Sequence, residues 1–212
     1  MNPLSNKLKQ NNIITHFTEL EYFTKITSFN QDFRDCTKLE TINIPISLTN
    51  LGNQTFYNCQ SLRYIDAPHV TSGGYQFYHC YELRNLNVVN MVGGSAQFES
   101  CRNLTELIIP KCTGAAYNQY YTFMHCSKIV TLDIRSFTHV GYFRQFDGCD
   151  ALRKIILPDT PPALTNPKNT QLNSSCHLYV RTEEVKQAYL AHSQWSYFAA
   201  ERYIVSPEDY EE

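Results

Sequence analysis

The sequence predicts a repeat solenoid, mainly β, in which parallel strands stack over about six coils between a short N-terminal cap and a helical C-terminal cap. Two observations predict this fold. A motif of Phe, two variable residues and Cys occurs six times at nearly constant spacing. Each copy leads into a short segment with apolar residues at alternate positions, the period of a strand with one buried face. One such unit cannot bury its own apolar side, so successive units must stack into one core.

The spacing of the motif is typical of leucine-rich repeats. Successive phenylalanines are 23, 21, 21, 25 and 23 residues apart, and an aliphatic residue follows each cysteine by three positions. Leucine-rich repeats have periods of about 20 to 29 residues, so the fold is predicted to be leucine-rich-repeat-like. The repeated phenylalanines are predicted to stack into a buried aromatic spine: Phe33, Phe56, Phe77, Phe98, Phe123 and Phe146.

Each motif is followed by a predicted strand. Proline stops four of these strands, as expected outside a hydrogen-bonded ladder, and the chain then returns along the opposite wall to the next phenylalanine. The expected strands lie within 39–44, 62–67, 83–88, 104–109, 129–134 and 152–157.

Six of the eight cysteines occupy one repeat position and are predicted to be buried, space-filling thiols. Side chains that point the same way from adjacent rungs do not supply the near-perpendicular dihedral angle of a disulfide. Cys112 and Cys176 lie off this ladder, and a pair between them stays open. The ladder comprises Cys36, Cys59, Cys80, Cys101, Cys126 and Cys149.

Motifs that carry catalysis or metal binding are missing from the sequence. There is no C-x-x-C, H-E-x-x-H, G-x-S-x-G or phosphate-binding G-x-x-x-x-G-K-[ST]. We therefore expect no catalytic residue, no metal ligand and no cofactor, and the protein is not expected to be an enzyme. The charge balance of 18 basic and 20 acidic residues gives no reason to expect nucleic acid as a partner. No apolar run reaches the roughly 18 residues that suggest a membrane span.

The chain is predicted to be a single domain over residues 1–212. Residues 1–12 are polar and expected to be loose, and 19–23 is expected to form a short helix that covers the first coil. The assignment is 13–32 for the N-terminal cap, 33–158 for six repeats, 159–205 for the C-terminal cap and 206–212 for an acidic tail.

The C-terminal cap begins where the repeat pattern breaks after Pro158. Residues 176–180 are predicted to form a last strand. Thr182 is the predicted N-cap of a helix that runs to about His192, with two glutamates placed favourably in its first turn. Trp195, the only tryptophan, is predicted to plug the last open coil.

The unit F-x-x-C-x-x-L-x-x-I-x-I-P, with a return segment ending in G-x-x-x-F, resembles the BspA-like (Treponema-type) leucine-rich repeats. This resemblance covers about residues 13–205, and Trp195 with the preceding helix resembles the usual C-terminal cap of that family. Departures are Arg181, where the cap commonly has Pro, a longer return over 115–122, and Val89 and Arg135 in place of the strand-ending Pro.

The resemblance implies surface recognition without catalysis, because these repeats occur on surface proteins of gut and oral Bacteroidales and of some parasitic protists. We therefore expect a non-catalytic adhesion module displayed on a bacterial surface, outside the cell, with a protein or glycan partner. The N-terminus has no apolar signal region, so a signal has been removed, or the chain leaves by another route, or it never leaves. The alternative is a structural or receptor-binding component of a larger assembly such as a virus particle.

The resemblance names no ligand residues, so binding residues are predicted from the strand pattern. Solenoids bind through exposed sheet faces, which makes the outward strand positions the candidates. Tyr64, Glu106 and Ile108 lie together in the middle of the array and are predicted to form a hot spot. The predicted binding residues are Tyr64, Asp66, Asn85, Asn87, Glu106, Ile108, Thr131 and Asp133.

Tyrosines near the phenylalanine corners form a second candidate surface, because tyrosine offers a rigid apolar face and a hydroxyl to proteins and sugars alike. This set comprises Tyr75, Tyr78, Tyr117, Tyr120, Tyr121 and Tyr142.

A ladder of free thiols predicts that its six cysteines are unpaired in the purified protein. Alkylation of the unfolded chain without reductant is expected to modify at least these six thiols, as read by intact mass. Several missing adducts would mean paired cysteines and would contradict the ladder.

Overall fold

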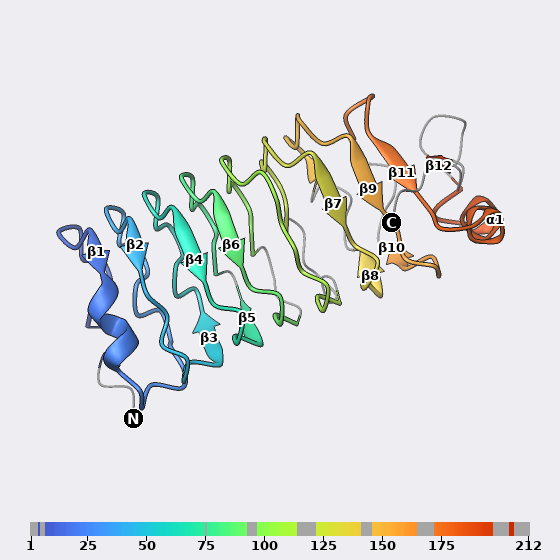
Figure 1. Ribbon diagram of the computed structural model, residues 1–212. Helices are drawn as coiled ribbons and strands as arrows, with labels where there is room; N and C mark the ends of the chain where they lie inside the picture. The colour runs from blue at the N-terminus through green and yellow to red at the C-terminus, as the bar shows by residue number, and fades with distance from the viewer. Residues whose placement is uncertain are drawn as a thin grey trace.

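The chain forms one elongated stack of coils with β1 at one end and α1 at the other, which confirms the predicted solenoid (Figure 1). This computed structural model describes residues 4, 7–74, 76–92, 97–113, 122–140, 146–164, 172–196 and 204–205. The acidic tail and the return segments 93–96, 114–121 and 141–145 lie outside the described residues.

The regular elements are short, as expected when each strand is one rung of a coil. The front wall contains β1 (His16–Phe17), β2 (Thr41–Ile42), β4 (Tyr64–Asp66), β6 (Asn85–Asn87), β7 (Thr131–Asp133), β9 (Lys154–Ile156), β11 (His177–Tyr179) and β12 (Ile204–Val205). The back wall contains β3 (Asn50–Asn53), β5 (Ser72–Gly74), β8 (His139–Val140) and β10 (Ala163–Leu164). The helices are the 3-10 helix η1 (Thr18–Tyr22) and α1 (Glu183–Ala191).

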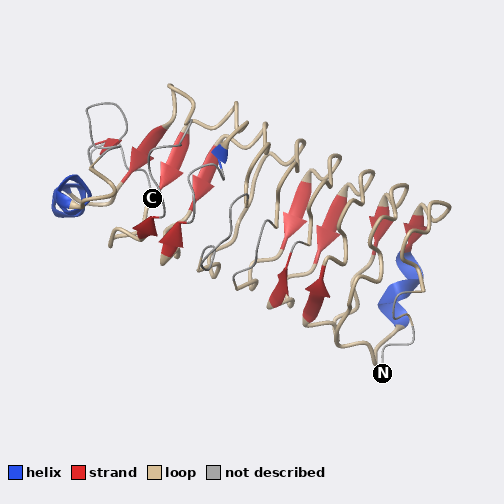
Figure 2. Ribbon diagram, turned by 180° about the vertical axis from the view of Figure 1, so that it is seen from behind, coloured by secondary structure: helices blue, strands red, loops and turns tan. Residues whose placement is uncertain are grey.

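The strands of both walls pair in parallel, because each coil repeats the path of its neighbour. The front wall holds two four-stranded sheets with the orders β1-β2-β4-β6 and β12-β11-β9-β7. On the back wall β3 pairs with β5 and β8 pairs with β10 (Figure 2). In the front wall Tyr64 is paired with Asn85 and Asp66 with Asn87, so equivalent repeat positions lie side by side.

The fourth coil corrects one expectation. A full strand was predicted within 104–109, but the described residues contain only an isolated bridge there, between Asn87 and Ile108. The front wall is therefore split into two sheets. The split falls at the coil where the spacing of successive phenylalanines changes from 21 to 25 residues.

The six phenylalanines of the repeat are buried and form one column of rings. Neighbouring rings are nearly parallel, with centroids 5.8 to 6.0 Å apart and interplanar angles of 14° or less. Each ring thus packs against the same ring of the adjacent coil, and the column runs through the middle of the core.

The six ladder cysteines are buried free thiols that also join adjacent coils. Each Sγ from Cys59 onward donates to the carbonyl of the phenylalanine in the preceding coil, at 3.0 to 3.2 Å. Burial raises the pKa of these thiols, that of Cys36 to about 11 and that of Cys149 to about 12. Cys112 and Cys176 are free as well, so the open question of their pairing is answered in the negative.

The residue before each ladder cysteine has a left-handed backbone, with φ between 59° and 72°. These residues are Asp35, Asn58, His79, Ser100, His125 and Gly148. Asn, Asp, His and Gly are the types that tolerate this conformation, so the sequence carried a signal for the corner that motif reading missed. The amide of each of the first five donates to a carbonyl of the next coil at 2.7 to 2.9 Å.

The N-terminus contains an extra, degenerate coil. The amide of Gln10, whose φ is 62°, donates to the Arg34 carbonyl at 2.7 Å, and the Cys36 thiol donates to the Leu8 carbonyl at 3.0 Å. Asn11 stands in the cysteine position and accepts from two backbone amides of its own turn. The expectation of a loose segment up to residue 12 is therefore wrong from residue 7 onward, because hydrogen bonds to the next coil order it.

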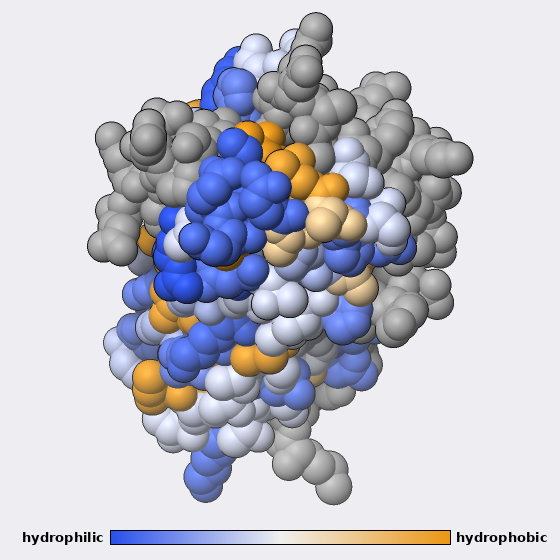
Figure 3. All heavy atoms as spheres, turned by 90° about the vertical axis from the view of Figure 1, so that its right-hand side faces the viewer, coloured by the Kyte–Doolittle hydropathy of each residue, from blue (hydrophilic) through white to orange (hydrophobic). Residues whose placement is uncertain are grey.

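The C-terminal cap closes the other end of the core. Thr182 caps α1 as predicted, its Oγ1 accepting from the amide of Val185 at 3.2 Å. Trp195 is fully buried, donates to the Pro162 carbonyl at 2.8 Å and meets the ring of Tyr189 edge-on. The described residues that face the viewer at this end are mostly hydrophilic (Figure 3).

Truncation of a central ring should unfold the array more readily than truncation of a terminal one. Phe98→Ala leaves a gap between the rings of Phe77 and Phe123 and is expected to cost about 3–5 kcal/mol. Phe146→Ala is expected to cost less, because the last coil can fray without dividing the stack. Thermal melts test this, and equal losses for the two variants would contradict it.

The left-handed corner makes a separate prediction at His125, whose side chain is exposed. His125→Val is expected to destabilise the fold by about 1–2 kcal/mol, because a β-branched residue disfavours positive φ. His125→Gly is the matched control and should melt at or near the wild-type temperature. Equal melting temperatures for the two variants would show that the corner imposes no backbone requirement.

Candidate functional site

The outward positions of the front wall form two rows of side chains. Along each strand the middle residue is buried and its two neighbours are exposed or half-buried. All eight predicted binding residues lie on this wall. One row contains Tyr64, Asn85, Glu106 and Thr131, and the other contains Asp66, Asn87, Ile108 and Asp133.

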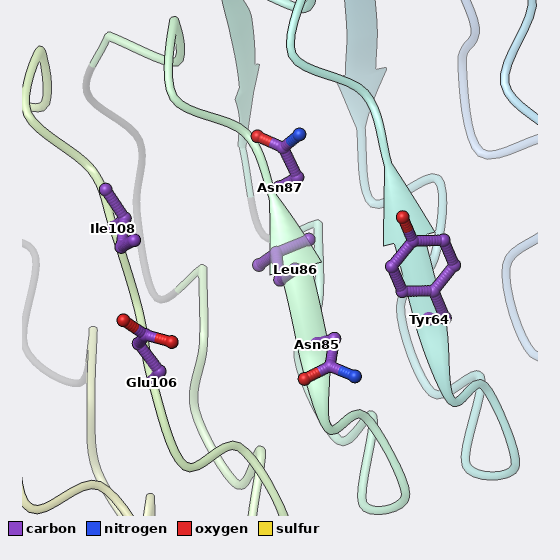
Figure 4. Close-up of a pocket in the computed structure, with 6 residues that line it drawn as sticks. All are labelled: Tyr64, Asn85, Leu86, Asn87, Glu106 and Ile108. Carbon is purple, nitrogen blue, oxygen red and sulfur yellow. The ribbon is translucent and has the colours of Figure 1, made fainter.

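Five of these residues surround a hollow of about 130 Å³ on the outer surface of three neighbouring coils. Thr131 and Asp133 belong to β7 in the second sheet and do not line it. The hollow, which we call the front hollow, is lined by Tyr64, Asn85, Leu86, Asn87, Glu106 and Ile108 (Figure 4).

Differences in side-chain length between coils create the front hollow. The short side chains of Asn85 and Asn87 stand on the central coil, between the larger Tyr64 on one side and Ile108 on the other. Leu86 lies between the two asparagines and is 8% exposed, so the floor is apolar. The sequence did not predict Leu86 as a site residue, because its position in the strand points inward. The short asparagines on either side of it were the sequence feature that could have indicated an exposed floor.

The polar groups around the front hollow differ in how they are engaged. The Asn87 amide nitrogen donates to the Asp66 carboxylate at 2.7 Å, which holds both side chains across adjacent strands. The pKa of the Tyr64 hydroxyl is raised, first by desolvation and then by the nearby Asp66 carboxylate. The part of the chain that the structure describes offers the Glu106 carboxylate no ion pair and no hydrogen bond.

Elsewhere on the front wall, polar side chains are tied to neighbours. Asp133 accepts from Arg135, with an N–O distance of 2.8 Å. The ring of His16 is hydrogen-bonded to the Thr41 hydroxyl at 2.7 Å, and the Lys154 ammonium lies 4.5 Å from the centroid of Tyr179. In the front hollow, by contrast, apolar surface lies beside a carboxylate to which the described residues offer no ion pair.

The second candidate surface, near the phenylalanine corners, has its ring faces covered. Tyr57 and Tyr78 stack at 4.7 Å, and the guanidinium of Arg34 lies 4.7 Å from the outer face of Tyr57. Burial, and then the Glu99 carboxylate, raise the pKa of the Tyr78 hydroxyl to about 12. The other five tyrosines of this predicted set lie outside the described residues.

A second hollow, of about 370 Å³, lies where the fifth and sixth coils turn from the front wall to the back wall. Its charged rim residues are occupied: Arg135 pairs with Asp133, and Asp159 pairs with Arg181. Its remaining lining comprises Ser136, Phe137, Thr138, Pro158, Thr160, Pro161 and Pro162.

Within the described residues, no group of three or more His, Cys, Asp and Glu side chains is arranged to hold a metal ion. None of the described helices combines the length and the apolar character that a bilayer crossing requires.

Comparison with protein families identifies the repeat. The family model described as "BspA type Leucine rich repeat region" matches residues 8–129 and 73–179, in six copies. These matches span most of the chain, so the protein belongs to the BspA-type leucine-rich repeat family. The match begins at residue 8, where the structure places the first, degenerate coil.

Two solved structures are similar to the chain at 15% sequence identity. One is a leucine-rich repeat protein from Bacteroides ovatus, with 81% of this chain and 56% of that chain covered and a TM-score of 0.44. The other is a leucine rich cell surface protein from Faecalibacterium prausnitzii, with 74% and 58% covered and a TM-score of 0.42. This chain thus spans less than two thirds of either protein. No curated protein matches it.

Proposed function

We propose that the protein is a non-catalytic recognition module that binds a protein or glycan partner through the front wall, with the front hollow at the centre of the contact. The observation that carries the proposal is the hollow itself: Tyr64 and Ile108 expose 47% and 54% of their surface on either side of an apolar floor. Large apolar side chains around a central depression are the arrangement found at binding hot spots.

The scaffold supports binding because it holds the front hollow rigidly. Tyr64 and Asn85 are on paired strands, and Ile108 is bridged to Asn87, so the side chains that line the hollow start from fixed backbone positions. Little conformational entropy is then lost when a partner docks, which favours affinity from a small contact. The same regular wall offers outward side chains on both sides of the hollow to extend the interface.

The proposed setting is a bacterial cell surface, where the module acts in adhesion. Membership of the BspA-type family supports this placement, since repeats of this type occur on surface proteins of gut and oral bacteria. Repeats stacked in one dimension give an extended binding surface, which suits a protein that must hold a partner on another cell or on a host.

The test is an array of glycans and extracellular host proteins probed with the purified chain. Tyr64→Ala is expected to weaken captured interactions at least about tenfold, because a hot-spot residue contributes more than about 1.4 kcal/mol. Tyr22→Ala is the matched control, because Tyr22 is 75% exposed but lies on η1, away from the front hollow. Interactions that survive both Tyr64→Ala and Ile108→Ala would overturn the proposal.

A further inference from the structure

The front hollow has features that select one chemical class of ligand group. Resting on the proposed function, we infer that it receives a single basic side chain, arginine in particular, presented by a protein partner. Its size, the orientation of the Tyr64 ring, the unengaged Glu106 carboxylate and the acceptor on Asn87 support this inference independently.

The size of the front hollow limits the ligand to one side chain or one ring. Its volume is about 130 Å³, and only six residues from three neighbouring coils line it. Walls from three coils would surround such a group, with the apolar Leu86 beneath it. An aliphatic stem that packs on Leu86 and Ile108 while its polar end reaches the rim matches the shape of a long, basic side chain.

Tyr64 provides a flat surface for a planar cation. Figure 4 shows the Tyr64 ring face on above its strand, and 47% of this residue is exposed. This differs from the tyrosines at the phenylalanine corners, where Arg34 and Tyr78 already cover the faces of Tyr57. A guanidinium placed on an open tyrosine face gains a cation–π contact, and its planar shape suits stacking better than an ammonium.

Charge favours a cation over a neutral or acidic group. Glu106 is the one ionisable carboxylate in the lining, and the described residues provide it with no cation. Two arginines on the preceding coils are engaged with other carboxylates, Arg63 with Glu40 at 3.1 Å and Arg84 with Glu82 at 3.6 Å. A partner that covered Glu106 with an apolar or acidic group would leave a desolvated, unpaired charge, which is costly.

Hydrogen bonding points the same way. Asn87 commits its amide nitrogen to Asp66 and thereby leaves its Oδ1 as an acceptor at the rim of the hollow. Together with the Glu106 carboxylate, this gives two acceptors on opposite sides of the floor. Arginine carries five N–H donors and no acceptor, so it can satisfy both, whereas a single ammonium is a compact point charge without a fixed fork of donors.

The experiment selects binders from a random peptide library on the wild-type chain and measures the selected peptides as synthetic ligands. We expect arginine to be enriched. Replacement of that arginine by citrulline, its neutral isostere, should weaken binding about tenfold or more, and replacement by lysine should weaken it less. The citrulline arm changes only the peptide, so it is independent of how any protein variant folds.

Variants of the protein complete the test. Glu106→Gln keeps the shape of the side chain and should reproduce the citrulline loss, and Glu106→Lys should abolish binding. Glu183→Gln on the exposed side of α1 removes the same charge away from the hollow and should leave affinity unchanged. The thermal melt of Glu106→Gln should match wild type, because Glu106 is exposed. Glu183→Gln loses a charge at the N-terminus of α1 and the contacts to Lys186 and Gln187, so it should melt slightly lower without a change in affinity.

The outcomes separate this inference from the proposed function. Binders could depend on Tyr64 but tolerate Glu106→Gln and citrulline, or only glycans could bind at Tyr64. Either result would support the front hollow as a binding site and would overturn the inference that it receives a basic side chain. If neither the peptide library nor the glycan and protein array yields binders that depend on Tyr64 or Ile108, the proposed function fails as well.

Discussion

The contact between the cysteine of one coil and the phenylalanine of the coil before it is the interaction on which the rest of this structure depends. In a stack, each coil contacts only its neighbours, so the position of each coil depends on the contacts that repeat between adjacent coils. Here the thiol donates to the phenylalanine carbonyl at 3.0 to 3.2 Å, and the phenylalanine rings stack. The left-handed residue before the cysteine donates its backbone N–H to a carbonyl of the next coil. These three links at one corner hold neighbouring repeats against each other at a nearly constant spacing.

That corner also explains why the thiols are chemically quiet. A repeated cysteine could form a disulfide or bind a metal. Here burial raises the pKa of each thiol, and from Cys59 onward its S–H group donates a hydrogen bond to a phenylalanine carbonyl. In the first coil Asn11 occupies the same position and binds its own backbone instead. The position therefore takes a small side chain that satisfies a nearby backbone group, as a donor for cysteine and as an acceptor for Asn11, without adding buried charge.

The proposed function lies on the outer surface of the front wall, where the repeat constrains side chains least. Inward positions must be apolar in every coil, whereas outward positions can vary from coil to coil without loss of packing. The front hollow arises from such variation, because the two short asparagines of its central coil stand between the larger Tyr64 and Ile108, with Leu86 as the floor. The corner tyrosines show the contrasting case, in which Arg34 and neighbouring rings use the exposed faces to pack against one another.

The sequence by itself determined the solenoid, the positions of its six repeats and the inward and outward faces of the strands, because these follow from a period that repeats six times. It also indicated both capping helices, the C-terminal one through Thr182 as its N-cap. The same alternation placed Tyr64, Glu106 and Ile108 on one face. Tertiary structure alone decided the break in the sheet at the fourth coil, the extra coil at Leu8, and which outward residues border a hollow with Leu86 as its floor. Those features depend on register and side-chain length between coils more than 20 residues apart, which a pattern within one coil does not specify.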